Sequence, residues 1–210
     1  HGNLEPGSLS FTLPDNTRVP VGGVEYLATH IKQLAAQNPR TVIVSAGDMI
    51  GASPLLSALF HDEPTIEAFN DIGLNFNAVG NHEFDEGLNE LQRGGCHPVD
   101  GCQDGDNFAG ADFRYLAANV FYEGTNRTIF PAFRVRTFQH GIKIAFIGMT
   151  LEGTPSIVTP SAVAGLEFRD EADTVNRLVG QLRRQGVRNI VVLIHEGGFP
   201  ALGGLYNECP

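Results

Sequence analysis

Three apolar segments with the character of buried strands each end in side chains that can bind a metal ion or carry a proton. The pairs are Thr41–Val44 with Asp48, Phe76–Val79 with Asn81 and His82, and Asn189–Ile194 with His195. Ligands of open α/β sheets gather at the carboxyl ends of strands, so these side chains are expected to meet although they lie far apart in the sequence. Oxygen and imidazole donors suit divalent metal ions such as Mn, Fe or Zn.

Segments of helical periodicity separate the predicted strands. Apolar residues recur at spacings of three and four between 22 and 38, which predicts an amphipathic helix. Further helices are predicted at 54–60, 64–72, 86–93 and 170–185. The other predictions are a loop at 1–21, a strand at 115–120, a hairpin at 133–149 and an irregular stretch at 150–168. Alternating strands and helices predict an α/β fold with a largely parallel sheet.

Length and charge narrow the classes of function. A chain of 210 residues is long enough for one domain with a substantial core. The formal net charge of −10 argues against a nucleic-acid duplex as the main partner, because phosphate contacts need clustered Lys and Arg. A small phosphorylated substrate stays compatible, since bound metal ions can supply local positive charge. No apolar run approaches the length of a membrane span.

Two of the three cysteines bracket a short polar loop. Cys96 and Cys102 lie in a segment rich in Gly and Asp, which has little apolar material to hold it. A disulfide between them is expected in an oxidising compartment, with Cys209 pairing with a cysteine beyond Pro210. Three free thiols are the alternative, and a zinc site is disfavoured because the paired ligand spacing is missing.

The polar strand ends also carry a family resemblance. Gly47-Asp48, Gly80-Asn81-His82-Glu83 and His195 resemble the ordered motifs of the calcineurin-like metallophosphoesterases. The longer run from Gly80 to Asp85 is similar to the branch of 5′-nucleotidases and 2′,3′-cyclic-nucleotide phosphodiesterases. The opening segment His1–Pro6 resembles the end of that family's Asp-x-His-Gly motif. The resemblance covers nearly the whole chain.

Two parts of the family pattern have no counterpart in the sequence. The first Asp, with the strand before it, would precede His1, and the last motif, Gly-His-x-His, would follow the segment around His195. Residues 1–210 are therefore expected to be a fragment of one metallophosphoesterase domain, without the C-terminal domain that recognises substrate in the family. Such a fragment is expected to bind metal weakly and to be weak or inactive in hydrolysis.

The resemblance implies a specific architecture and reaction. The fold would be two mixed β-sheets packed as a sandwich between helices, with the 133–149 hairpin in the second sheet. The reaction would be hydrolysis of a nucleotide phosphomonoester by metal-bound hydroxide at two divalent metal ions. Mn, Zn, Fe, Co, Ca and Mg are not distinguished by the sequence. The protein is expected to be secreted, periplasmic or at the cell surface.

Four residues are candidate metal ligands: His1, Asp48, Asn81 and His195. Asp48 is the candidate bridge between two metals, because one carboxylate can hold two cations close together. Its alternative role is to cap the helix that follows near Pro54. His195 has the alternative of a structural histidine, and His1 that of a disordered terminus.

His82 and Asp85 are the candidate catalytic pair. Adjacent side chains point apart, so His82 is not expected to share a metal with Asn81. Asp85 can reach back to one ring nitrogen, which fixes the tautomer and favours the imidazolium. The charged ring would stabilise the transition state or protonate the leaving oxygen. Asp85 could instead cap the next helix.

Two rival functions stay open. The first is a phosphodiesterase that acts on 2′,3′-cyclic nucleotides. The second is a metal-free binding module at the cell surface, which keeps the fold but has lost activity. Intact Asp48, Asn81, His82, Asp85 and His195 argue against that second rival.

Overall fold

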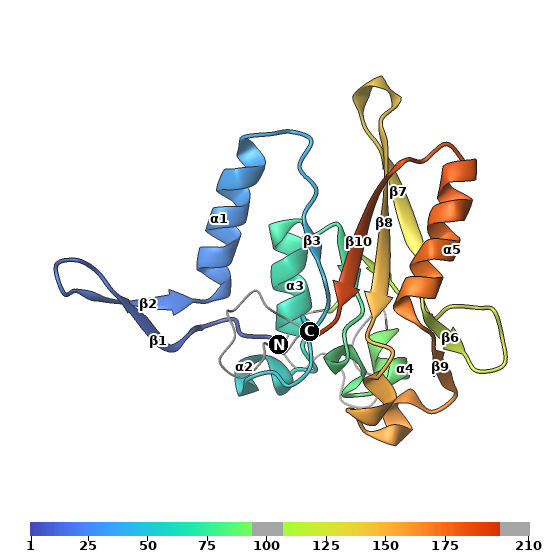
Figure 1. Ribbon diagram of the computed structural model, residues 1–210. Coiled ribbons are helices and arrows are strands. Elements are labelled where there is room, and N and C mark those ends of the chain that lie inside the picture. Colours follow the sequence, from blue (N-terminus) through green and yellow to red (C-terminus); the bar gives the residue numbers. More distant parts are fainter. Residues whose placement is uncertain (94–106, 198–210) are drawn as a thin grey trace, which may run out of the picture.

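The computed structural model describes residues 1–93 and 107–197 of the chain. Figure 1 shows two β-sheets at the centre with helices on either side. The predicted disulfide of Cys96 and Cys102, and Cys209, lie outside the described residues. Among the described helices, none combines the length and the apolar character needed to cross a membrane.

The first sheet is parallel and has the strand order β3-β4-β5. Its strands are β3 (Val44–Ser45), β4 (Phe76–Ala78) and β5 (Arg114–Leu116). Helix α3 (Glu63–Ile72) covers its outer face, where Ile66 joins a buried cluster with residues of the following loops. Helix α1 (Val24–Ala36) lies beyond α3 and has no buried residue.

The second sheet is mixed and has the order β10-β8-β7. Strand β10 (Asn189–His195) runs parallel to β8 (Lys143–Thr150), and β7 (Phe133–Thr137) runs antiparallel to it. Helix α5 (Glu171–Arg184) covers the outer face. Its buried Leu178 and Leu182 pack in one cluster with alternate residues of β8.

The two sheets pack face to face. A buried cluster drawn from both of them fills the interface: Ala78, Leu116, Phe146 and Leu193. The order of layers is therefore helix, sheet, sheet, helix, which confirms the sandwich. The hairpin predicted at 133–149 forms β7 and β8 of the second sheet, as expected.

Short elements complete the description. The helices are α2 (Leu55–Ala58) and α4 (Leu88–Leu91), with 3-10 turns at His82–Phe84, Gln139–Gly141, Thr154–Ser156 and Pro160–Val163. Strands β6 (Val120–Tyr122) and β9 (Leu166–Phe168) pair with each other in antiparallel fashion.

Three local predictions are wrong. The stretch 150–168, predicted to be irregular, ends in strand β9. Residues 1–21 contain an antiparallel hairpin of β1 (Pro6–Thr12) and β2 (Arg18–Gly22), closed by a turn in which Asp15 accepts a hydrogen bond from Thr17 N. The strand predicted at 115–120 is divided between β5 and β6, which belong to different sheets. Asn119 lies at the break, where its buried amide bonds the backbone of Thr150 instead of continuing a ladder.

Candidate metal centre and active site

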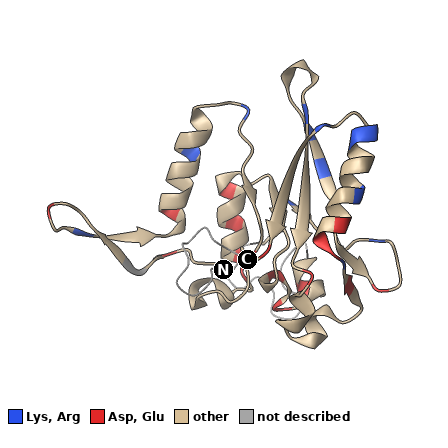
Figure 2. Cartoon of the chain, in the orientation of Figure 1, with Lys and Arg blue, Asp and Glu red and all other residues tan. Residues whose placement is uncertain are grey.

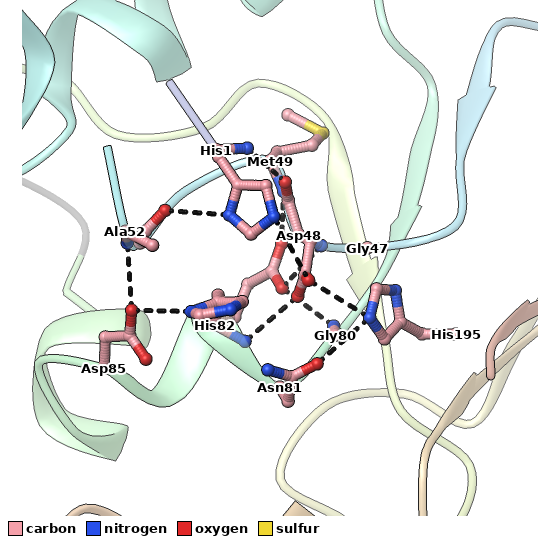
Figure 3. A network of polar contacts seen from close by, with 12 residues as sticks. His1, Gly47, Asp48, Met49, Ala52, Gly80, Asn81, His82, Asp85 and His195 are labelled. Carbon is pink, nitrogen blue, oxygen red and sulfur yellow. Dashed lines mark hydrogen bonds and ion pairs between the residues drawn. The ribbon is translucent and has the colours of Figure 1, made fainter. Parts of the chain in front are cut away.

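The carboxyl ends of β3, β4 and β10 lie close together, and each leads to a candidate site residue (Figure 3). Thr150, which pairs with His195 in the register of β8 and β10, joins the two sheets at this edge. The Oγ1 of Thr150 donates a hydrogen bond to the Val79 carbonyl at 2.7 Å. The contact of His195 Nδ1 with the Ala46 carbonyl, for example, joins residues that are 149 positions apart. All of the site residues named from the sequence lie in this one region.

Asp48 occupies the centre of the group. Its two carboxylate oxygens have different surroundings: Oδ1 accepts a hydrogen bond from His82 N at 3.0 Å, whereas Oδ2 lies 3.2 Å from His195 Nε2 and 3.7 Å from His1 Nε2. The alternative role as a helix cap is not seen, because α2 follows Pro54 and has no side-chain cap. Asp48 and His1 also line an open hollow of about 400 Å³.

Electrostatics at Asp48 favour the charged carboxylate. Burial opposes ionisation, but the hydrogen bonds from His195 and from His82 N outweigh it and lower the pKa of Asp48 below its ordinary value. The same contact with Asp48 raises the pKa of His195, against the opposing effect of burial. The pair therefore behaves as a partly buried ion pair.

His195 is oriented by its other ring nitrogen. Nδ1 lies 3.0 Å from the Ala46 carbonyl and can only donate to it, which leaves Nε2 to face Asn81 Oδ1 at 3.1 Å and Asp48 Oδ2 at 3.2 Å. A neutral ring would direct a lone pair at two oxygen acceptors, which is unfavourable. Positive charge is therefore required at this point, either as a proton on Nε2 or as a cation between the three atoms.

His1 extends the group on the other side of Asp48. Its Nδ1 lies 3.2 Å from the Gly51 carbonyl, and its ring meets the ring of His82 edge to face with centroids 4.5 Å apart. Ligand atoms of His1, Asp48 and His82 all lie within 4.8 Å of one another. His82 is thus also within reach of a metal ion held by His1 and Asp48, a use that the sequence analysis did not assign to it.

His82 and Asp85 form the expected pair. The 3-10 turn at His82–Phe84 brings Asp85 Oδ2 to 2.8 Å from His82 Nδ1. The same oxygen accepts a hydrogen bond from Ala52 N at 2.9 Å, which fixes the carboxylate. Asp85 does not cap the next helix, because α4 begins after Gly87.

Glu83 is the residue whose role the sequence analysis missed. It is 2% exposed, and its carboxylate accepts hydrogen bonds from Asp48 N and Gly80 N at 2.8 Å each and from Met49 N at 2.9 Å. Burial raises its pKa above the ordinary value, with the backbone donors acting in the opposite direction. Its signal in the sequence was its place at the end of the motif Gly80-Asn81-His82-Glu83, to which no role for Glu83 was attached.

Glycine allows the two loops to approach each other. A Cβ atom on Gly80 would lie 2.2 Å from Asp48 Oδ1, and one on Gly47 would lie 2.6 Å from Gly80 N. Gly47 also has a φ of 103°, a conformation that residues with a side chain rarely adopt. The closeness of Asp48 to Asn81 therefore depends on both glycines.

In Figure 2 several segments coloured for Asp and Glu lie around the strand ends, whereas many of those coloured for Lys and Arg lie toward the far end of the sheets. Arg183 and Arg184, for example, occupy the last turn of α5. Among the described residues, the polar contacts of the Asp48 carboxylate come from the rings of His1 and His195 and from the backbone N–H of His82. A bound phosphate group would accordingly depend on metal ions for most of its charge compensation.

Comparisons with known proteins agree with this geometry. No protein-family model matches the sequence. An uncharacterised protein encoded in the pqq-V 5′ region of Acinetobacter calcoaceticus is 52% identical over 66% of this chain and 74% of its own length. Endonuclease YhcR of Bacillus subtilis is 38% identical over 83% of this chain. Cell wall protein Lmo0130 of Listeria monocytogenes is 35% identical over 96%. The chain spans only 14% and 26% of the lengths of these last two relatives.

Solved structures show the same fold. The 5′-nucleotidase precursor of Thermus thermophilus has a TM-score of 0.73 and 27% identity, and the match covers 93% of this chain and 35% of that protein. The calcineurin-like phosphoesterase YfkN of Bacillus subtilis has a TM-score of 0.67 and 23% identity, over 94% of this chain and 59% of that one. With its motifs, sandwich and relatives taken together, the chain belongs to the calcineurin-like metallophosphoesterases, in the branch of the 5′-nucleotidases.

Proposed function

We propose that residues 1–210 belong to one domain, the metal-binding catalytic domain of a phosphohydrolase that removes phosphate from nucleotides. The observation that carries the proposal is the position of Asp48 Oδ2, which faces the Nε2 atoms of both His195 and His1. One oxygen between two imidazole nitrogens is the arrangement expected of a carboxylate shared by two metal ions. The similarity to a 5′-nucleotidase structure supports nucleotides as the substrate class.

The donors in the site fit divalent metal ions. Asp48, Asn81 and His195 would hold one ion, because an anionic oxygen, a neutral carbonyl oxygen and an oriented Nε2 converge within hydrogen-bond distance. His1 and Asp48 would contribute to a second. A hydrogen bond from the second ring nitrogen of His195 to a backbone carbonyl is typical of metal-binding histidines. When bound, two such ions supply an activated water and offset charge on the phosphoryl oxygens.

His82 would provide the proton chemistry. Its Nδ1 is engaged by Asp85, so Nε2 is the atom that can hold a proton beside the substrate. Asp85, fixed in turn by Ala52 N, keeps the ring in one orientation. His82 would then donate to the leaving oxygen of the ester, as a general acid.

A location outside the cytoplasm is part of the proposal. The name of the Listeria relative places that protein in the cell wall, and it aligns with 96% of this chain. We therefore propose a secreted, periplasmic or cell-surface protein whose partner is a small phosphate ester.

Phosphodiester hydrolysis is a second candidate function. The relative that is 38% identical is named an endonuclease, and that name denotes cleavage of internal phosphodiester bonds. The net charge of −10 disfavours a duplex as substrate, so a small cyclic nucleotide fits this candidate better.

The test is a substrate profile of the natural protein after chelation and reloading with Mn or Zn. Release of phosphate from AMP is compared with hydrolysis of 2′,3′-cyclic AMP and of a single-stranded oligonucleotide. Metal-dependent release from AMP at the highest kcat/KM is the expected result. A preference for the diesters would establish the second candidate, and the absence of both metal binding and hydrolysis would leave a binding module.

A further inference from the structure

We propose that Glu83 is a positioning residue, which holds the loops carrying Asp48 and Asn81 at the separation that lets both side chains bind the same metal ion. The inference rests on the proposed function and assigns no contact between Glu83 and substrate. It concerns how the chain keeps the site preformed before any ion arrives.

The contacts of Glu83 join two separate loops through one carboxylate. Oε2 accepts from Asp48 N and from Gly80 N, and Oε1 accepts from Met49 N. The Asn77 side chain adds a longer contact to Oε1 at 3.3 Å. The loop after β3 and the loop after β4, 35 residues apart at Glu83 and Asp48, are thus fixed to a single rigid group.

These three backbone hydrogen bonds to Glu83, from Asp48, Met49 and Gly80, form a clamp that acts directly on the proposed ligands. Asp48 has a φ of 56°, in the left-handed region, which is an uncommon conformation for a residue with a side chain and persists only where its surroundings hold it. Glu83 holds the N–H of Asp48 itself. On the other loop it holds Gly80 N, one peptide before Asn81. His82 N then closes a ring by donating to Asp48 Oδ1.

Only a carboxylate can satisfy this set of donors. Both oxygens of Glu83 face N–H groups, and an ionised carboxylate is an acceptor at both of them. In Glu83→Gln one oxygen becomes an NH₂ group, which would face backbone donors and leave at least one of them buried without an acceptor. Glu83→Asp keeps the charge but shortens the side chain by one methylene, so it cannot reach both loops.

The experiment measures binding of Mn²⁺ alone, followed by the electron paramagnetic resonance signal of the free ion, in the natural protein after chelation. Glu83→Gln is compared with Glu63→Gln, a matched control: Glu63 is 1% exposed, and its carboxylate pairs with Arg93 instead of the ligand loops. Both substitutions are expected to lower the thermal unfolding temperature. Only Glu83→Gln should weaken Mn²⁺ binding, by roughly 10–100-fold, as for other groups that orient metal ligands.

The outcomes separate this inference from the proposed function. A folded Glu83→Gln variant with the Mn²⁺ affinity of the wild type overturns the inference, as does an equal loss of affinity in Glu63→Gln. If Glu83→Gln does not fold, amide hydrogen exchange of the wild type decides: the N–H groups of Asp48, Met49 and Gly80 should be protected, and exchange at unprotected rates overturns the clamp. A wild-type protein that neither binds Mn²⁺ nor hydrolyses nucleotides refutes the proposed function, whereas protection of those amides is measured independently of it.

Discussion

The pair of His82 and Asp85 gives the sharpest test of the proposed chemistry. His82→Ala removes the proposed general acid, a role typically worth about 10²–10⁴ in rate. Asp85→Asn leaves the acid in place and removes only the charged partner at 2.8 Å from Nδ1. We therefore expect the second substitution to cost much less turnover than the first, with metal content near that of the wild type in both.

The size of the Asp85 effect follows from its surroundings. A hydrogen bond to a charged group contributes about 1.5–3 kcal/mol. The side chains of His82 and Asp85 are 32% and 33% exposed, so screening by solvent favours the lower end, about 1.5 kcal/mol. Since about 1.4 kcal/mol corresponds to a factor of ten, Asp85→Asn is expected to lower kcat roughly tenfold.

A double-mutant cycle distinguishes this mechanism from a purely structural effect. Asp85 also fixes Ala52 N, so its substitution can disturb the loop without involving His82. Release of phosphate from AMP is measured for the wild type, both single variants and the double variant at saturating Mn. If Asp85 acts through His82, the double variant is no slower than His82→Ala alone. A further tenfold loss in the double variant would refute the reasoning, and loss of metal in His82→Ala would make His82 a ligand.

Other predictions test the site and the fold separately. Gly80→Ala places a Cβ atom 2.2 Å from Asp48 Oδ1, so it should destabilise the protein by about 1–3 kcal/mol and weaken metal binding in a calorimetric titration. In the presence of a chelator, Asp48 raises the pKa of His195. The pairing of the two side chains therefore stabilises the folded protein fully below about pH 6.5, and this stabilisation is lost as the pH rises through the raised pKa of His195. The unfolding temperature should therefore show a component that falls over that range and is missing in His195→Gln; an identical pH profile in both would contradict the pairing. Leu182→Ala, at a fully buried position of α5, should cost about 2–5 kcal/mol in denaturant unfolding while the folded fraction keeps its metal affinity.

Much of the fold was predictable because its signals are local. The apolar runs before Asp48, Asn81 and His195 indicated strands, and the spacing of apolar residues in 22–38 indicated a helix that the structure places at Val24–Ala36. The hairpin at residues 1–21 was missed because its Gly, Pro, Asn and Ser content was interpreted as a loop, although the segment around Asp15 forms the turn between two extended strands. The break at Asn119 was also unpredictable, since its cause is a set of bonds to Thr150, 31 residues away.

By itself, the sequence determined which side chains stand at the strand ends, because each lies at the end of its strand or within a few residues of it. That the ends of two different sheets meet was decided by the packing of those sheets. The tertiary structure alone decided which atoms each of those side chains contacts. Asp48 Oδ2 is directed at the histidines because His82 N, 34 residues away, occupies Oδ1. Glu83 has no motif of its own that reveals its partners, since three backbone N–H groups from two loops become neighbours only when the sheets pack. Periodicity is encoded within a few residues, whereas the choice of a hydrogen-bond partner depends on which distant atoms the fold brings within about 3 Å.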